Sequence, residues 1–292
     1  MNQPQQPGPQ HMPAMRRSYL FVPGNRPERI AKALAAGPDA VIVDLEDAVP
    51  PDEKCAARAA ALAALAALPA AGPPVLLRIN TVRSRLGLAD LLAAVALMER
   101  APHALAGLML PKAMPEDIAL TGDVMDEAGI AGEIGALIET AAGLEEAARA
   151  ARASPRLSFL MFGGADLALD LGVQLQWDPL VNARARLVQA CGAARKPAVD
   201  MPWVRLDDFA GESAEMARSF ALGFTARAAI HPRQIPAIHA ALMPTPDEIA
   251  QARRVIDAFT AASERACLLD GRLVERPLVE GCRRILARAR PV

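Results

Sequence analysis

The sequence predicts an α/β protein, and within that class a (β/α)₈ barrel of the TIM type. Short runs of apolar and β-branched residues alternate along the chain with longer segments rich in Ala, Leu, Glu and Arg. Strands that alternate with helices in this way form a parallel sheet with the helices packed outside it. Eight such runs precede residue 240, which favours a closed barrel over an open, doubly wound sheet.

The expected elements follow in order along the chain. The predicted strands are residues 18–23, 40–46, 75–80, 107–112, 134–140, 157–164, 197–200 and 228–232. The predicted helices lie between them, at residues 27–36, 52–68, 87–99, 115–128, 143–152, 180–194 and 211–222. The seventh strand has the weakest pattern, because it is brief and begins with a proline.

Three parts of the chain are expected to differ in organisation. Residues 1–15 are polar and rich in proline, so we predict a disordered tail and not a signal peptide. Residues 16–240 would form the barrel. Residues 241–292 exceed what a barrel requires, with one helix expected at 243–259 and another at 278–289. We expect this C-terminal extension to cover the barrel or to contact a neighbouring subunit.

The composition argues against several classes of partner. Hydrophobic residues make up 52% of the 292 residues, which is enough for a large core, and the formal net charge is −1. This charge gives no electrostatic reason to expect nucleic acid or an anionic membrane as a partner. No apolar stretch reaches the roughly 18 residues that a membrane span needs. The four cysteines form no CxxC motif, which favours reduced thiols and a cytoplasmic location.

Most of the predicted strands end in a polar or charged residue. These residues are Asp44, Glu46, Arg78, Asn80, Lys112, Glu139, Asp166, Asp200 and His231. In a barrel, the C-terminal strand ends face one shared cavity, where catalytic groups lie. Any one of these residues taken alone is more often a helix cap or a solvated strand end, but the pattern as a whole predicts an active site.

Carboxylates crowd this predicted cavity, and a metal ion would make the crowding tolerable. Glu139 and Asp166 end adjacent predicted strands, so they could bind one ion directly. Oxygen donors without a His or Cys cluster favour Mg²⁺, or Mn²⁺, over zinc. Asp44 and Glu46 are two apart, so both are expected on one face of the second strand. Together with Asp47 they would hold the water molecules of the ion.

Several motifs along the chain resemble those of a known family. They are "RSYLFVPGNRPERIAKAL", "DAVIVDLEDAVPPDEKCAAR", "LLRIN", "LPK", "IGALIET", "FGGADLALDLG", "AIHPRQI" and "PTPDEIAQARRVI". In this order they resemble the HpcH/HpaI aldolase and citrate lyase β-subunit family. More narrowly, they are similar to its citrate lyase β-like and malyl-CoA lyase branch. The resemblance extends from about residue 16 to residue 290.

The resemblance implies a Mg²⁺-dependent barrel, usually a homotrimer or hexamer, that cleaves or forms a carbon–carbon bond next to a CoA thioester. In that family the residues matching Glu139 and Asp166 bind the metal, and the residue matching Arg78 binds the reacting oxygen. The backbone N–H groups around Gly164, Ala165 and Asp166 would hold the carboxylate of an oxo acid. Glycine-rich turns also present N–H groups to anions for reasons independent of the family.

The chain departs from the resemblance near its C-terminus. Relatives that act on malyl- or citramalyl-CoA carry an Asp in a "DxP" segment that enters the active site of the neighbouring subunit. The matching stretch here is "VERP", which places Glu275 at that position. Glutamate keeps the charge but reaches one methylene further, so Glu275 is a candidate catalytic residue. The alternative is a surface glutamate paired with Arg272 or Arg276.

Two basic residues are candidates for binding the phosphates of CoA. Arg26 follows the first strand at the expected rim of the cavity, where its guanidinium could contact a phosphate. Lys54 lies just after the acidic stretch that ends the second strand. The alternative for the segment around Arg26 is that Asn25 caps a helix with Pro27 in its first turn. The alternative for Lys54 is a solvated charge on a helix.

The leading hypothesis is a CoA-thioester lyase working by retro-Claisen or retro-aldol cleavage. Its substrate would be malyl-, methylmalyl-, citramalyl- or citryl-CoA, and its products an acyl-CoA and an oxo acid. One alternative is a citrate lyase β subunit that uses an acyl-carrier-protein thioester. A malyl-CoA thioesterase and a CoA-independent 2-oxo-acid aldolase also remain open. A non-catalytic barrel that binds metal and acyl-CoA as a sensor or scaffold is the alternative from another class.

Overall fold

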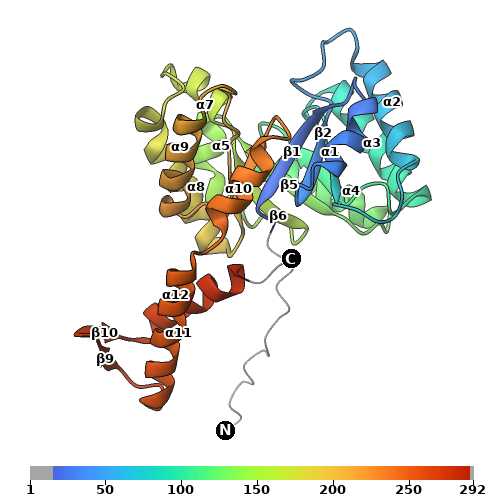
Figure 1. The fold of residues 1–292 in the computed structure, drawn as a ribbon. Helices are drawn as coiled ribbons and strands as arrows, with labels where there is room; N and C mark the ends of the chain where they lie inside the picture. The colour runs from blue at the N-terminus through green and yellow to red at the C-terminus, as the bar shows by residue number, and fades with distance from the viewer. Residues whose placement is uncertain (1–15, 290–292) are drawn as a thin grey trace. The chain divides into compact units, whose positions relative to one another are not determined.

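The computed structural model describes residues 16–289, so the predicted tail at 1–15 lies outside the described residues. The chain forms two compact units. Residues 17–240 make up one of them, and residues 241–289 belong to the other. Both units can be followed in Figure 1.

The first unit is a closed barrel of eight parallel strands, which confirms the predicted fold class. The strands are β1 (Ser18–Pro23), β2 (Ala40–Asp44), β3 (Val75–Arg78), β4 (Gly107–Leu110), β5 (Glu133–Ile138), β6 (Leu157–Phe162), β7 (Ala198–Asp200) and β8 (Ala226–Ala229). Each strand pairs with the next, and β8 pairs with β1 to close the sheet. The short seventh strand is present, beginning one residue later than expected.

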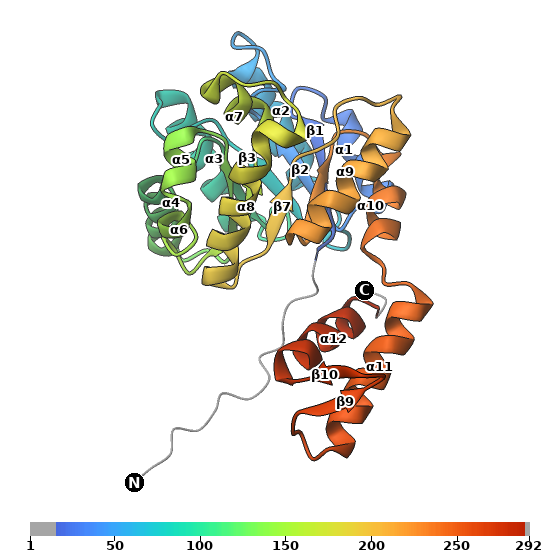
Figure 2. The same cartoon turned by 90° about the vertical axis from the view of Figure 1, so that its left-hand side faces the viewer.

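Helices surround this barrel, as Figure 2 shows from a second direction. They are α1 (Glu28–Ala35), α2 (Lys54–Ala66), α3 (Arg85–Arg100), α4 (Pro115–Glu127), α5 (Ala141–Glu145), α6 (Ala147–Ala150), α7 (Gly164–Leu171), α8 (Trp177–Ala194), α9 (Phe209–Leu222) and α10 (Gln234–Leu242). The sequence did not predict α7 or α10, and it predicted α5 and α6 as one helix. Helix α7 begins at Gly164, a residue that the sequence pattern assigned to the end of the sixth strand.

The strands are mostly apolar because both faces of the sheet are covered. The exceptions in β2, β3, β7 and β8 are buried charged residues: Asp44, Arg78 and Asp200 at strand ends, and Arg227 within β8. Every residue of β2, β3, β4, β7 and β8 is buried. Inside the barrel, the rings of Tyr19 and Phe159 lie 4.7 Å apart between centroids. Gly135 on the neighbouring strand makes room for Phe159, because a Cβ atom at Gly135 would lie 2.3 Å from the phenyl ring. The interior of the barrel is therefore filled with side chains, and the open space lies at its C-terminal end.

The second unit has a small core of its own. Its elements are α11 (Pro246–Ala261), β9 (Cys267–Leu269), β10 (Arg272–Val274) and α12 (Arg276–Arg288). Helix α11 begins with a capping box, in which Thr245 and Glu248 each accept a backbone N–H of the other. Asp270 and Gly271, both with positive φ, form the turn between the two antiparallel strands. Val255 and Phe259 of α11 pack with residues of the hairpin and of α12.

Within residues 16–289, no helix combines the length and the apolar character that crossing a membrane would require.

The close approach of β4 to β5 gives a test of the barrel packing. A Cβ atom at Gly107 would lie 2.0 Å from the backbone oxygen of Glu133, so Gly107→Ala must push the two strands apart. We expect this substitution to lower the free energy of unfolding by about 2–3 kcal/mol. The measurement is chemical denaturation followed by circular dichroism.

Gly192→Ala is the matched control for this substitution. Gly192 lies within α8, and an added Cβ atom there would have no other atom within 4 Å. Alanine favours helix over glycine, so we expect the free energy of unfolding to stay the same or to rise by up to about 1 kcal/mol. Equal effects of the two substitutions would contradict the described strand packing.

Candidate active site

A cavity of about 400 Å³ lies at the C-terminal end of the barrel strands. Residues at the ends of β1, β2, β3, β5 and β6, and after β7 and β8, line it. They include Phe21, Asp44, Asp47, Arg78, Leu137, Glu139, Met161, Gly163, Gly164, Ala165, Asp166, Met201, Val204 and Ile230. This end of the barrel is where TIM-barrel enzymes carry their active sites.

A buried ion pair between Asp44 and Arg78 forms one wall of the cavity. The two residues end neighbouring strands and face each other in the register of β2 and β3. Arg78 donates from Nε to Asp44 Oδ1 (2.7 Å) and from Nη2 to Asp44 Oδ2 (2.6 Å). The same carboxylate accepts the backbone N–H groups of Glu46 (2.8 Å) and Ala48 (3.1 Å). Asp44 is thus committed to four hydrogen bonds, which suits it to positioning Arg78 and not to transferring protons.

The chain turns immediately after Asp44, which corrects one expectation from the sequence. Strand β2 ends at Asp44, so the prediction that Asp44 and Glu46 share a face of that strand was wrong. The bonds from the N–H groups of Glu46 and Ala48 to Asp44 bend the chain into a loop. In this loop, Glu46 Oε2 lies 3.0 Å and Asp47 Oδ2 3.5 Å from Arg78 Nη1. One guanidinium therefore contacts three carboxylates.

The charges of this cluster change the pKa values of its members. Burial would lower the pKa of Arg78, but the hydrogen bonds and the charge of Asp44, and the charges of Glu46 and Asp47, raise it above its ordinary value. Burial raises the pKa of Glu46, and Arg78 offsets part of this rise. Burial would also raise the pKa of Asp47. Its hydrogen bond with Glu46 and the charge of Arg78 outweigh this effect and lower the pKa below its ordinary value. Arg78 therefore stays a cation.

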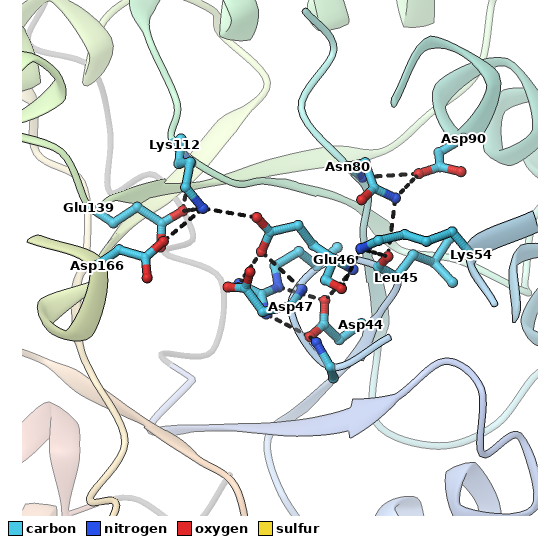
Figure 3. Close-up of polar contacts among 12 residues, drawn as sticks. Asp44, Leu45, Glu46, Asp47, Lys54, Asn80, Asp90, Lys112, Glu139 and Asp166 are labelled. Atoms are coloured by element: carbon cyan, nitrogen blue, oxygen red, sulfur yellow. Dashed lines mark hydrogen bonds and ion pairs between the residues drawn. The ribbon is translucent and has the colours of Figure 1, made fainter. Parts of the chain in front are cut away.

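Lys112 is a second cation in the cluster, and it was predicted only as a polar residue at the end of a strand, without a specific function. Its ammonium nitrogen lies 2.7 Å from Asp166 Oδ2, 3.0 Å from Glu46 Oε1 and 3.9 Å from Glu139 Oε1 (Figure 3). Its backbone N–H donates to Glu139 Oε1 (2.7 Å). Lys112 has a φ of 44°, an uncommon backbone conformation for a residue other than glycine. This conformation lets both its backbone and its side chain contact the carboxylates.

Glu139 and Asp166 lie next to each other beside Lys112, as Figure 3 shows. Glu139 directly follows β5 and is buried, whereas Asp166 lies in the first turn of α7 and is half-buried. Burial raises the pKa of Glu139 to about 8, although the charge and the backbone N–H of Lys112 oppose the rise. Gly163 allows the chain to pass close to Glu139, because a Cβ atom there would lie 2.8 Å from Glu139 Oε2.

The donor set of this cavity fits a hard divalent cation that keeps open coordination positions. Within residues 16–289, no group of three His, Cys, Asp or Glu residues is close enough to form a metal site by itself. Mg²⁺ usually takes only one or two protein carboxylates and fills its octahedron with water and substrate oxygens. Glu139 and Asp166 supply two such carboxylates, and the ammonium group of Lys112 beside both indicates that positive charge is favoured there.

The turn between β6 and α7 can bind an anion. Helix α7 begins at Gly164, and the N–H group of Leu167 makes the first bond within it, to the oxygen of Gly163. The N–H groups at the beginning of a helix have no acceptor within it, so those of Gly164, Ala165 and Asp166 are suited to bind a carboxylate. Each of these three residues lines the cavity.

Other predicted strand-end residues point to partners outside the cavity. The amide of Asn80 donates to Asp90 Oδ2 (2.6 Å) and to the backbone oxygen of Leu45 (3.1 Å). Asp200 is fully buried and pairs with Arg184, whose Nε lies 3.1 Å from Asp200 Oδ1. His231 is exposed and accepts the backbone N–H of Arg233. These three polar residues stabilise local structure.

The two candidates for binding CoA phosphates differ in their surroundings. Arg26 is exposed in the loop after β1. Lys54, at the beginning of α2, donates from Nζ to the backbone oxygens of Leu45 (3.0 Å) and Glu46 (2.6 Å). Its ammonium group therefore anchors the acidic loop, and the expectation that it is a solvated charge was wrong. Neither residue is among those that line the cavity.

Glu275 lies in the second unit, directly before α12, and its side chain is exposed. Within residues 16–289, its carboxylate forms no ion pair or hydrogen bond. The alternative of a surface pairing with Arg272 or Arg276 is not found among these residues, and Arg276 contacts Glu264 instead (3.7 Å). A catalytic function of Glu275 stays a prediction.

The fold and the cavity together define the class of the protein as a TIM-barrel enzyme. The profile of the HpcH/HpaI aldolase/citrate lyase family matches residues 17–232. The chain therefore belongs to this family, as its motifs predicted.

Individual relatives cover nearly the whole chain. A citrate lyase subunit beta-like protein of Deinococcus radiodurans is 34% identical over an alignment of length 285 that covers 94% of this chain and 98% of that protein. An L-malyl-CoA/beta-methylmalyl-CoA lyase of Cereibacter sphaeroides is 32% identical over an alignment of length 299 that covers 92% of each chain. The crystal structure of CitE from Mycobacterium tuberculosis, in complex with magnesium, acetoacetate and coenzyme A, is 32% identical. It has a TM-score of 0.80 over 94% of this chain and 98% of that one.

The raised pKa of Glu139 predicts how the stability of the metal-free protein depends on pH. A pKa of about 8 in the folded state, against an ordinary value of 4.5, means that the folded state binds this proton more tightly. The stabilisation is then complete below pH 4.5 and is lost as the pH rises to about 8. Glu139→Gln should flatten this part of the profile. The measurement is urea denaturation between pH 5 and 9 with a chelator present, and identical profiles for the two proteins would contradict the assignment.

Proposed function

We propose that the protein is a Mg²⁺-dependent carbon–carbon lyase that cleaves, or forms, a 3-hydroxyacyl-CoA thioester. Its products would be an acyl-CoA and an oxo acid. The observation that carries this proposal is the placement of Glu139 and Asp166 beside Arg78 and Lys112 at the C-terminal end of the barrel. Two relatives support the proposal. One is named as a lyase of malyl-CoA and methylmalyl-CoA, and the other was crystallised with magnesium and coenzyme A.

In this proposal Glu139 and Asp166 hold the metal ion. When bound, the ion would polarise the α-carboxylate and the hydroxyl oxygen of the substrate as a Lewis acid. The N–H groups of Gly164, Ala165 and Asp166 bind the carboxylate and orient the bond that breaks. Arg78 donates to the oxygen on which negative charge develops, a contribution of about 3 kcal/mol if it resembles single oxyanion donors.

The other carboxylates act on the two cations. Asp44 fixes the plane of the Arg78 guanidinium through its two parallel hydrogen bonds. Glu46 bridges Arg78 and Lys112, and so sets the distance between them. Both are therefore positioning residues in this proposal. For proton transfer we propose Glu275 of the partner subunit, on the basis of the "VERP" segment alone.

A homotrimer or a hexamer is proposed as the assembly, since a site completed by a neighbouring copy needs one. The compact second unit, which a barrel does not require, is consistent with a function in assembly. A cytoplasmic location and the lack of a nucleic-acid partner stay predictions from the composition.

The direct test of the proposed function is a condensation assay. Purified protein, Mg²⁺ and glyoxylate are incubated with acetyl-CoA or with propionyl-CoA, and the thioesters are identified by mass spectrometry. A condensed thioester supports the lyase, whereas release of free CoA with the hydroxy acid indicates a thioesterase. In a parallel reaction without a thioester, condensation of an aldehyde with a free oxo acid would indicate the CoA-independent aldolase. No product in any reaction would contradict the proposal.

Removing either metal-binding carboxylate should abolish turnover and leave the fold intact. We expect Glu139→Gln and Asp166→Asn each to lower kcat at least about 100-fold, since losing even an outer partner of a metal ligand costs 10- to 100-fold. Asp178→Asn is the matched control, because Asp178 also lies in the first turn of a helix but is 86% exposed. Full activity of either site variant would contradict the assignment, as would a loss in the control.

Lys112 should compete with the metal ion, because its ammonium group contacts the same two carboxylates. Lys112→Met removes that positive charge, so we expect the dissociation constant for Mn²⁺ to fall by about tenfold. Titration followed by electron paramagnetic resonance measures this value without turnover. Lys32→Met removes an exposed charge in α1 and should leave it unchanged. Weaker Mn²⁺ binding in Lys112→Met would show that Lys112 supports the metal and does not compete with it.

A further inference from the structure

We propose that the cavity selects a 2-oxo acid with one carboxylate and a small apolar substituent over a 2-oxo acid with two carboxylates. This inference rests on the proposed function, because it assumes that an oxo acid binds at the metal and the β6–α7 turn. The space around that turn distinguishes oxo acids with one carboxylate from those with two, whereas the family resemblance implies substrates of both kinds.

The residues that line the cavity carry an excess of negative charge. The charged ones are Asp44, Asp47, Glu139, Asp166 and Arg78, which makes four carboxylates and one guanidinium. A bound divalent cation would reduce this excess of negative charge but would not reverse it. One substrate carboxylate can be accommodated by the metal and the N–H groups of the turn. A second carboxylate would enter a cavity that still carries net negative charge.

Arg78 is not available to bind a second substrate carboxylate. Its Nε and Nη2 donate to Asp44, and its Nη1 contacts Glu46 and Asp47. One face of its guanidinium lies over the ring of Phe21, 5.2 Å from the centroid. The N–H groups that remain can serve a single oxygen, which the proposed function assigns to the reacting one. Binding a carboxylate through a parallel pair of hydrogen bonds would require breaking the pair with Asp44.

Lys112, the nearest other cation, would keep Glu46 as a carboxylate partner when a metal ion displaces it from Asp166. Its ammonium group contacts Asp166 at 2.7 Å and Glu46 at 3.0 Å, and it does not line the cavity. Among residues 16–289, the lining therefore offers no cation that is free of protein carboxylates.

An apolar wall lies next to the turn that binds the carboxylate. A Cβ atom at Gly164 would lie 2.4 Å from Met201 Sδ, and one at Gly163 would lie 3.2 Å from Leu137 Cγ. These two apolar side chains thus border the turn directly. Met161 lines the same cavity, and Val204 and Ile230 line it with partly exposed side chains.

This wall determines what the oxo acid can carry. The substituent on the oxo carbon is only two bonds from the carboxylate, so it must lie close to the same turn. A hydrogen, methyl or ethyl group would be buried favourably against Met201 and Leu137. A carboxymethyl group would lose its water there without gaining a hydrogen-bond partner, which is costly for a charged group. We expect a preference of about 100-fold or more for the apolar substituent.

The test compares three oxo acids in two measurements. Pyruvate, 2-oxobutyrate and freshly prepared oxaloacetate are each titrated into the protein with Mg²⁺ by calorimetry. The same acids are supplied with acetyl-CoA, and kcat/KM for condensation is determined. We expect pyruvate and 2-oxobutyrate to exceed oxaloacetate by about 100-fold in both measurements. Equal or tighter binding of oxaloacetate overturns the inference.

The two measurements distinguish a failure of this inference from a failure of the proposed function. If no acid condenses but the calorimetric order holds, the lyase proposal fails and the selectivity stands. If condensation occurs with all three acids at similar kcat/KM, the lyase stands and the selectivity fails. Binding of none of the acids with Mg²⁺ present overturns both.

A charge added at the rim of the cavity gives a second test. Val204 lines the cavity and is 48% exposed, so Val204→Arg should fold and place a cation at the apolar wall. We expect the oxaloacetate to pyruvate ratio of kcat/KM to rise at least about tenfold. Val173→Arg adds the same charge at an exposed position outside the lining, and it should leave the ratio unchanged. An unchanged ratio in Val204→Arg would overturn the charge argument.

Discussion

The C-terminal end of the barrel depends on balancing carboxylates that are held close together and partly out of water. Five carboxylates meet there, those of Asp44, Glu46, Asp47, Glu139 and Asp166, and the cations among them are Arg78 and Lys112. If all of these groups were ionised, five negative and two positive charges would leave a deficit of three positive charges. Two ways of reducing this deficit are a proton on Glu139, whose pKa burial raises to about 8, and a divalent cation. Proton and metal would therefore compete for the same carboxylate, which couples metal binding to pH.

Parallel strands bring these groups together, because their carboxyl ends meet at one edge of the sheet. Asp44 and Arg78 are direct neighbours in the register of β2 and β3. Ile138 and Phe162 pair at the ends of β5 and β6, so Glu139 and the turn that leads to Asp166 begin side by side. Gly163 permits this close approach. The barrel interior is packed with side chains, so the chemistry is confined to the loops and the last residue of each strand.

Much of this arrangement could be predicted from the sequence, and the remainder depends on tertiary contacts. The buried strands form continuous apolar runs, so all eight were recognised, and the polar residues that follow them marked the site. Lys112 could not be assigned, because its contacts require a left-handed backbone that a lysine seldom adopts. The anchoring of Lys54 on Leu45 and Glu46 depends on the turn after Asp44, which looked like a continuing strand. Helix α7 was missed because it is short and begins at Gly164, which the sequence pattern assigned to the sixth strand.

The proposed lyase activity requires a divalent cation between two neighbouring strand ends, with one glutamate and one aspartate as its protein ligands. The most direct measurement is diffraction from crystals soaked in Mn²⁺, recorded near the manganese absorption edge. We expect a single strong anomalous peak within coordinating distance of both Glu139 and Asp166, with the Lys112 ammonium group displaced from Asp166. A peak at any other position, or Lys112 still bound to both carboxylates with no peak beside them, would contradict the proposal.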